Sequence, residues 1–118
     1  MAKASTDMLI VDRCYNLVMW SCNHIENFPR SRRHTLGDRM ETQLYDVLEA
    51  LIRARYTRNR LALLDDVNIQ LELLRFQFRM AKDQRCLSVD SYGYATREVN
   101  EIGKLLGGWI KATKAAKP

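Results

Sequence analysis

Arginines gather in two short stretches of this 118-residue chain, and these stretches carry the strongest chemical signal in the sequence. The first runs from Arg30 to Arg33, and the second runs from Arg53 to Arg60. An arginine guanidinium is planar and always charged, so it can bind a phosphate through two parallel hydrogen bonds. We therefore expect both stretches, together with two C-terminal lysines, to contact nucleic-acid phosphates. The predicted phosphate-binding residues are Arg30, Arg32, Arg33, Arg53, Arg55, Arg58, Arg60, Lys111 and Lys114.

A third set of basic residues is Arg75, Arg79 and Lys82, which are spaced by four and three positions. On a helix this spacing places the three side chains along one edge, where like charges repel one another weakly. Glu72 and Asp83 can offset part of that repulsion. We interpret this edge as a contact strip for a partner protein, and a plain solvated helix face is the alternative.

The formal net charge of +5 suits a polyanionic partner. Tyr56 lies inside the second arginine stretch, where its ring can either stack on a nucleobase or pack against the protein. The sequence has no signature of an RNA-recognition motif, a KH domain, a zinc finger or a helix-turn-helix. Nucleic-acid binding is therefore expected to depend on phosphate charge and on shape, and to weaken as salt is added.

Residues that could perform catalysis fall into no recognisable arrangement. The sequence lacks the HExxH, GxxxxGK[ST] and GxSxG motifs, and it lacks the ExxH pattern of di-iron bundles. The three cysteines, Cys14, Cys22 and Cys86, have no CxxC spacing, so we interpret them as small buried hydrophobic residues. His24 is interpreted as a satisfied or surface residue. We predict no enzymatic activity, no cofactor and no metal.

Long periodic segments with few glycines and prolines must position these residues. The spacing of apolar residues predicts four helices, over residues 7–28, 35–56, 59–85 and 89–114. Pro29 is expected to end the first helix. The residues suited to cap the first, second and fourth helices are Thr6 or Asp7, Thr35 and Ser88. Short connections make neighbouring helices antiparallel, so residues 1–118 are predicted to form one all-α domain, an up-down-up-down four-helix bundle.

Each predicted helix has one apolar stripe that can face the core. In the first helix the stripe is Val11, Tyr15, Val18, Cys22 and Ile25, and in the second it is Leu36, Met40, Leu44, Val47, Leu48 and Leu51. In the third helix it is Leu64, Val67, Leu71, Leu74, Phe78 and Ala81, and in the fourth it is Tyr92, Ala95, Val99, Ile102, Leu106 and Trp109.

The third helix carries a second apolar stripe, formed by Ile69, Leu73, Phe76 and Met80, roughly opposite the first on a helical wheel. A bundle helix needs only one buried stripe, and leaving these side chains in water would forgo roughly 1.5–3 kcal/mol for each of them. We therefore predict a homo-oligomer that uses this stripe as its interface. A single wide stripe within one subunit is the alternative.

The segment from Glu101 to Lys111 contains three glycines, at positions 103, 107 and 108, and each costs about 1 kcal/mol inside a helix. That cost predicts a close approach of another backbone beside Trp109. The preceding Leu74–Ala81 and Leu87–Tyr92, and the opening Met8–Arg13, fit the same pattern. Together these segments resemble the four-helix-bundle family that contains the accessory variability determinant (Avd) of diversity-generating retroelements. Proteins encoded in 23S rRNA intervening sequences belong to the same family.

The resemblance implies a homopentameric barrel of bundles that binds a reverse transcriptase and its template RNA or cDNA and supports error-prone cDNA synthesis. It also implies a cytoplasmic protein encoded by a bacterium or a phage. No stretch approaches the roughly 18 consecutive apolar residues of a membrane span, so no membrane partner is expected. Two alternatives remain open: an rRNA- or ribosome-associated bundle with no polymerase partner, and a structural scaffold that binds only proteins.

Overall fold

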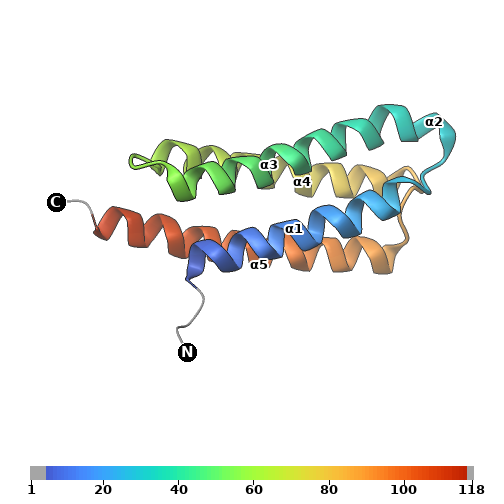
Figure 1. Cartoon of the computed structure of the whole chain (residues 1–118). Helices are drawn as coiled ribbons and strands as arrows, with labels where there is room; N and C mark the ends of the chain where they lie inside the picture. The colour runs from blue at the N-terminus through green and yellow to red at the C-terminus, as the bar shows by residue number, and fades with distance from the viewer. Residues whose placement is uncertain (1–4, 117–118) are drawn as a thin grey trace.

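The computed structural model describes residues 5–116, and within that range it contains helices and no strand (Figure 1). The four long helices are α1 (Thr6–Ile25), α3 (Asp38–Tyr56), α4 (Leu61–Asp83) and α5 (Val89–Ala115). A short helix, α2 (Arg30–Arg32), and a π-helical turn, η1 (Arg33–Gly37), lead directly into α3. The predicted all-α class and the four long helices are confirmed.

The helices form an antiparallel bundle in which α1 packs against α3 and α5, and α4 packs against the same two helices from the other side. The start of α1, the α3–α4 turn and the end of α5 therefore lie at one end of the bundle (Figure 1). The opposite end holds α2, η1 and the connection between α4 and α5. The bundle measures 51 Å along its longest axis.

The core follows the predicted stripes closely in three of the helices. All six stripe residues of α4 are buried, and in α5 only Tyr92 is left partly exposed. In α3 the predicted residues Met40, Leu44, Val47 and Leu51 are buried, and Leu48 is half-buried. Leu36, which was predicted for the same stripe, lies in η1 and is also half-buried. In α4 and α5, the strict alternation of three- and four-residue steps therefore predicted the buried face correctly.

The stripe predicted for α1 was wrong in its rotation about the helix axis. Tyr15 is exposed, Val11 and Cys22 are only half-buried, and of the predicted stripe only Val18 and Ile25 are buried. The buried face of α1 consists of Ile10, Cys14, Leu17, Val18, Ser21 and Ile25. Two apolar series run along this helix one residue apart, which is 100° of rotation, and the packed series is the one that keeps the tyrosine hydroxyl in water.

Two of the predicted helix caps were also wrong. Helix α1 begins after Ser5, so Thr6 and Asp7 lie inside its first turn. Thr35 lies inside η1, and its hydroxyl donates back to carbonyl oxygens of the preceding turn instead of capping α3. The predicted cap at Ser88 is confirmed, because its Oγ accepts a hydrogen bond of 3.1 Å from the amide of Ser91.

The chain turns sharply between α1 and α2, and Gly37 allows this corner to pack against the bundle. A Cβ atom on Gly37 would lie 3.0 Å from Cγ2 of Ile25 and 3.6 Å from Cδ2 of Phe28. Pro29 stands at the N-terminal boundary of α2, where its fixed φ angle suits a helix start. The helix that we expected at Thr35 therefore starts earlier, and the π-helical turn joins its first residues to α3.

The glycines of α5 differ from the expectation of close backbone approach. Among the described residues, no atom lies within 4 Å of a Cβ built on Gly107 or Gly108. At Gly103 the near neighbour is a side chain, the guanidinium of Arg75, at 3.2 Å. No other backbone of the same subunit therefore approaches α5 closely beside Trp109, so that prediction was wrong.

Within residues 5–116, no helix has the combination of length and apolar character that crossing a bilayer requires.

Candidate nucleic-acid interface and exposed apolar faces

The second arginine stretch surrounds the α3–α4 turn, and hydrogen bonds hold this turn in one shape. The Thr57 hydroxyl donates to the carbonyl oxygen of Arg53 at 2.7 Å, and Nε of Arg60 donates to the carbonyl oxygen of Thr57 at 3.2 Å. The Arg60 guanidinium also lies 5.7 Å from the ring centroid of Trp109 in α5. This contact fixes the turn beside the C-terminal end of α5, which carries Lys111 and Lys114.

Most cations at this end have no acidic partner among residues 5–116. Arg55 forms an ion pair with Asp7, with Nε 3.1 Å from Oδ2. Hydrogen bonds from Ser5 and from Arg55 lower the pKa of Asp7, although partial burial opposes them. The remaining cations of this end form no ion pair with any residue between 5 and 116. We call this group the end cations: Arg53, Arg58, Arg60, Lys111 and Lys114.

Tyr56 is the last residue of α3 and stands among these cations. Its side chain is 80% exposed, and the guanidinium of Arg55 lies 5.7 Å from its ring centroid. The interpretation of Tyr56 as a packing residue is therefore wrong. The exposed ring remains available to a ligand.

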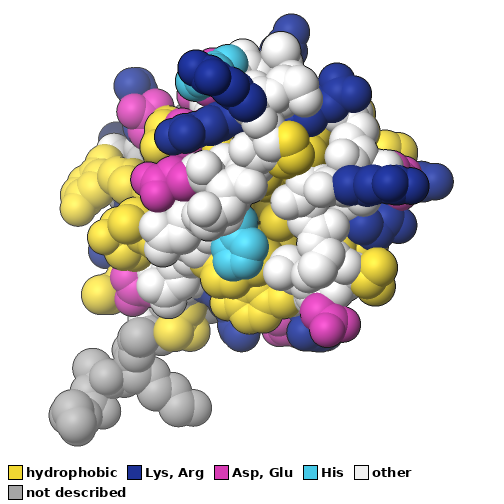
Figure 2. Space-filling view, turned by 90° about the vertical axis from the view of Figure 1, so that its right-hand side faces the viewer, with side chains coloured by type: hydrophobic (Ala, Val, Ile, Leu, Met, Phe, Trp, Pro, Cys, Tyr) yellow, Lys and Arg dark blue, Asp and Glu magenta, His cyan; other side chains and the backbone are white. Residues whose placement is uncertain are grey.

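The first arginine stretch lies at the opposite end of the bundle. Arg30, Arg32 and Arg33 are exposed on α2 and η1. Figure 2 looks onto this end, where Lys and Arg side chains lie around the rim of the molecule. The structure therefore does not join the predicted phosphate-binding residues into one patch. It divides them between the two ends of the 51 Å bundle.

The predicted partner-protein residues lie along one edge of α4, and each is engaged by a neighbour. Nη1 of Arg75 lies 3.2 Å from Oε2 of Glu72, and its Nε donates to Oδ1 of Asn100 at 3.2 Å. Asp83 lies near both remaining cations, with one oxygen 3.9 Å from Nε of Arg79 and the other 3.4 Å from Nζ of Lys82. Of the three, Arg79 is the most exposed.

Two apolar faces of the bundle remain in contact with water. The second stripe of α4 is exposed: Ile69 by 63%, Leu73 by 47%, Phe76 by 53% and Met80 by 42%. The alternative of one wide stripe buried within the subunit is therefore wrong. We call this stripe the outer face of α4. The second apolar face lies where α1 meets α3, and we call it the α1/α3 seam; it consists of Met8, Tyr15, Met19, Tyr45 and Ile52.

The seam was not predicted, because the spacing of apolar residues in α1 assigned Tyr15 to the core. Tyr45 marks the line of contact between the two helices, since its hydroxyl lies 3.5 Å from Sγ of Cys22 in α1. Exposed tyrosine and methionine side chains on two neighbouring helices would have been recognisable only with the correct rotation of α1.

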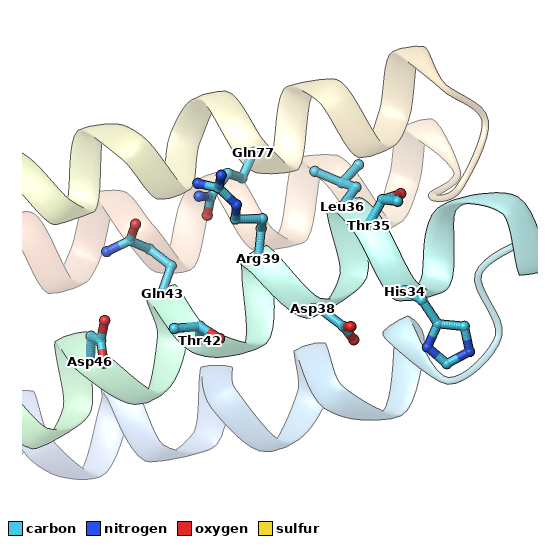
Figure 3. Close-up of a pocket in the computed structure, with 9 residues that line it drawn as sticks. All are labelled: His34, Thr35, Leu36, Asp38, Arg39, Thr42, Gln43, Asp46 and Gln77. Carbon is cyan, nitrogen blue, oxygen red and sulfur yellow. The ribbon is translucent and has the colours of Figure 1, made fainter.

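A polar groove of about 840 Å³ lies beside η1, along α3 and α4 (Figure 3). In the figure the Arg39 side chain reaches toward Gln77 of α4. The Gln77 side-chain oxygen is buried and accepts no hydrogen bond within the described part of the chain. The groove mixes cations, carboxylates and amides, so its charge favours no single class of ligand; its lining residues are His34, Thr35, Leu36, Asp38, Arg39, Thr42, Gln43, Asp46 and Gln77.

His24 makes local contacts, and the three cysteines differ in burial. His24 stacks on Trp20 with ring centroids 3.9 Å apart, and its Nδ1 lies 2.9 Å from the Trp20 carbonyl oxygen. Cys14 is buried as predicted, and burial raises its pKa to about 12. Cys22 and Cys86 are only half-buried, so the prediction was too strong for them. Residues 5–116 contain no cluster of three histidine, cysteine or acidic residues that could hold a metal.

Comparison with known proteins supports the resemblance. A family model described as bAvd-like matches residues 8–113, which covers nearly all of the chain and includes every predicted site except Lys114. No curated protein sequence matches the chain. The resemblance to Avd proteins is thereby confirmed. The chain belongs to the bAvd-like family.

Proposed function

We propose that this protein is a basic, oligomeric accessory protein of a diversity-generating retroelement. In this proposal it binds the reverse transcriptase and the template RNA of the element and supports mutagenic cDNA synthesis. Membership of the bAvd-like family supports the proposal. The observation that carries it is the group of end cations, which form no ion pair within residues 5–116. The protein supplies binding and geometry, and the polymerase active site belongs to the partner.

The end cations are suited to phosphates because their charge is not neutralised locally. Each phosphate that a cation binds releases condensed counterions, so the affinity falls with rising salt. For a single strand the slope of log K against log salt is about −0.7 for each phosphate contact. The arginine stretch at the other end adds a second contact region for the same polyanion.

The outer face of α4 and the α1/α3 seam support the oligomeric part of the proposal. The two faces differ in composition, and they belong to helices at different positions around the bundle. When two unlike surfaces of identical subunits bind head to tail, the assembly closes into a ring if the rotation permits. We propose that the outer face of α4 in one subunit contacts the seam of the next, in a homopentamer of the kind that the family resemblance implies.

The edge of α4 that carries Arg75, Arg79 and Lys82 is the proposed contact for the reverse transcriptase. It lies beside the outer face of α4, so it remains at the margin of a subunit interface. Glu72 and Asp83 hold these cations in defined positions, which favours directed contacts with carboxylates of a partner.

Copurification with the reverse transcriptase and retention of template RNA test the two binding functions separately. The variant Arg75→Ala/Arg79→Ala should lose the polymerase and retain RNA, and Arg53→Ala/Arg58→Ala should lose RNA affinity and retain the polymerase. Lys104→Ala is the matched control, because Lys104 also forms an exposed ion pair, with Glu101 at 3.3 Å, on α5. Circular dichroism should give the same helix content for all variants.

Three results would contradict the proposal or parts of it. Unchanged copurification by folded Arg75→Ala/Arg79→Ala protein removes the assignment of the polymerase contact. Salt-sensitive RNA binding with no association to any reverse transcriptase supports the rRNA-associated alternative. An absence of RNA binding even at low salt supports the protein scaffold.

A further inference from the structure

The exposed ring of Tyr56 has no structural task that the fold explains. Its hydroxyl makes no hydrogen bond to a residue between 5 and 116, and only a fifth of the side chain is covered. Trp109 at the same end is 5% exposed and lies under the Arg60 guanidinium. A large aromatic side chain at the tip of a helix gains little from this position in the free protein.

Neighbouring residues hold the ring in a defined place. Arg55 lies 5.7 Å from the ring centroid, and its ion pair with Asp7 anchors the guanidinium to α1. On the other side of Tyr56, the Thr57 hydroxyl ties the turn back to Arg53 at 2.7 Å. The ring is therefore displayed by a preorganised turn, which lowers the entropic cost of binding a flat ligand to it.

Charges on both sides of Tyr56 define the ligand that fits. Arg53 lies one helical turn before the ring and Arg58 lies two residues after it, and both are exposed without an ion pair in the described chain. A flat apolar surface flanked by free cations matches a nucleotide, which has a flat base and charged phosphates. Paired bases are stacked inside a duplex and cannot lie on the ring, so the ligand must offer an unpaired base.

We propose that Tyr56 is a stacking platform for an unpaired base of single-stranded nucleic acid, with the adjacent phosphates bound by Arg53 and Arg58. This inference rests on the proposed nucleic-acid binding and goes further, since it names the residue that distinguishes single strands from duplexes. Stacking on an aromatic side chain is expected to contribute about five- to one-hundredfold to the affinity for each base.

The experiment is an anisotropy titration with three labelled probes of equal length: an eight-nucleotide oligouridylate, its abasic counterpart, and an eight-base-pair RNA duplex. Tyr56→Leu removes the aromatic face, and Tyr56→Phe retains it. The matched control is Tyr94→Leu, because Tyr94 is another exposed tyrosine, and it lies on α5 away from the end cations and from both apolar faces. We expect Tyr56→Leu to bind oligouridylate about five- to one-hundredfold more weakly, with unchanged affinity for the abasic probe. Tyr56→Phe and Tyr94→Leu should bind oligouridylate as the wild type does.

The outcomes separate this inference from the function on which it rests. If the wild type binds oligouridylate and folded Tyr56→Leu binds it equally well, the platform is wrong and the phosphate contacts stand. If the wild type binds the abasic probe as tightly as oligouridylate, stacking contributes nothing and the platform is again wrong. If the wild type binds none of the three probes at low salt, the nucleic-acid part of the proposed function fails together with the platform.

Discussion

Replacing Phe76 with serine tests whether copies of this protein assemble through α4. Phe76 is 53% exposed on the outer face of that helix, so about half of its side chain would be covered by a neighbouring subunit. Serine and phenylalanine have similar helix propensities, and exposed substitutions away from special features change stability by roughly 0.5 kcal/mol or less. The variant should therefore fold as well as the wild type and differ only in association.

The size of the effect follows from the exposed area. A phenylalanine buries roughly 150–250 Å² when it is fully covered, so half of it corresponds to about 100 Å². At about 25 cal/mol for each square ångström, covering that area stabilises an interface by about 2.5 kcal/mol. Because 1.4 kcal/mol corresponds to a factor of ten, Phe76→Ser should weaken each contact between subunits roughly 60-fold.

Sedimentation velocity over a wide range of protein concentration measures this shift. The wild type should sediment as a multiple of 13.8 kDa, and Phe76→Ser should need about 170 times more protein to reach the same degree of assembly, because a ring of five subunits forms five contacts in four association steps. Val89→Ser is the control, because Val89 is 73% exposed but stands at the start of α5. The reasoning is refuted if the wild type remains a 13.8 kDa monomer at micromolar concentration, or if Phe76→Ser assembles like the wild type.

Three further predictions concern stability and reactivity. Gly107→Ala should raise the free energy of unfolding by up to about 1 kcal/mol, because alanine favours the helix and its Cβ meets no neighbour. Gly37→Ala should lower the free energy of unfolding, because its Cβ would press on Ile25 of α1. Urea titrations that give both substitutions an effect of the same sign would contradict this prediction. Asp7→Asn should reduce stability at pH 7 by up to about 1 kcal/mol. Because folding lowers the pKa of Asp7, the stabilisation is present above the unfolded value of about 3.9 and is lost as the pH falls through the folded value. Unfolding curves of Asp7→Asn and the wild type should therefore converge at low pH, and an equal gap at pH 7 and at pH 2 would be inconsistent with the ion pair. Cys14 should resist a thiol reagent until the protein unfolds, because burial keeps its thiol protonated. Mass spectrometry identifies the labelled cysteines, and labelling of Cys14 in the native protein would argue against its burial.

The rotation of each helix was predictable where only one apolar series runs along it. In α4 the two series lie on nearly opposite sides, so they could be assigned to different surfaces without confusion. In α1 the series that contains Tyr15 and the series that contains Cys14 are adjacent, and only the packing of α3 and α5 decides between them. Sequence patterns contain no information about those neighbours.

The helix boundary near Pro29 differs from the prediction for another reason, which is that proline and threonine each suit two positions relative to a helix. Proline disfavours a helix before it and suits the first turn of a helix after it, and the expected helix end at Pro29 rests on the first property alone. A threonine hydroxyl can cap the start of a helix, or it can donate to carbonyl oxygens of the preceding turn inside a helix. The Thr35 hydroxyl does the second. The division of the arginines between two ends, in contrast, follows from the order and length of the helices alone.

The exposure of single side chains at the candidate site depends on tertiary contacts. No pattern in the sequence indicates that Arg55 of α3 forms an ion pair with Asp7 of α1, or that the Arg60 guanidinium lies over the Trp109 ring. The ion pair with Asp7 neutralises Arg55, whereas Arg53, Tyr56 and Arg58 remain exposed.

The separation of the two arginine stretches sets a minimum footprint for any strand that touches both. At the 3.4 Å rise per nucleotide of a duplex strand, the 51 Å length of the bundle corresponds to about 15 nucleotides, and a single strand, which can extend further per nucleotide, needs fewer. Shorter oligonucleotides can occupy only one end of a subunit, so their affinity should grow with length up to that size and then gain a further increment once both ends are bridged. The length of the bundle therefore determines how long a strand must be to contact both arginine stretches of one subunit.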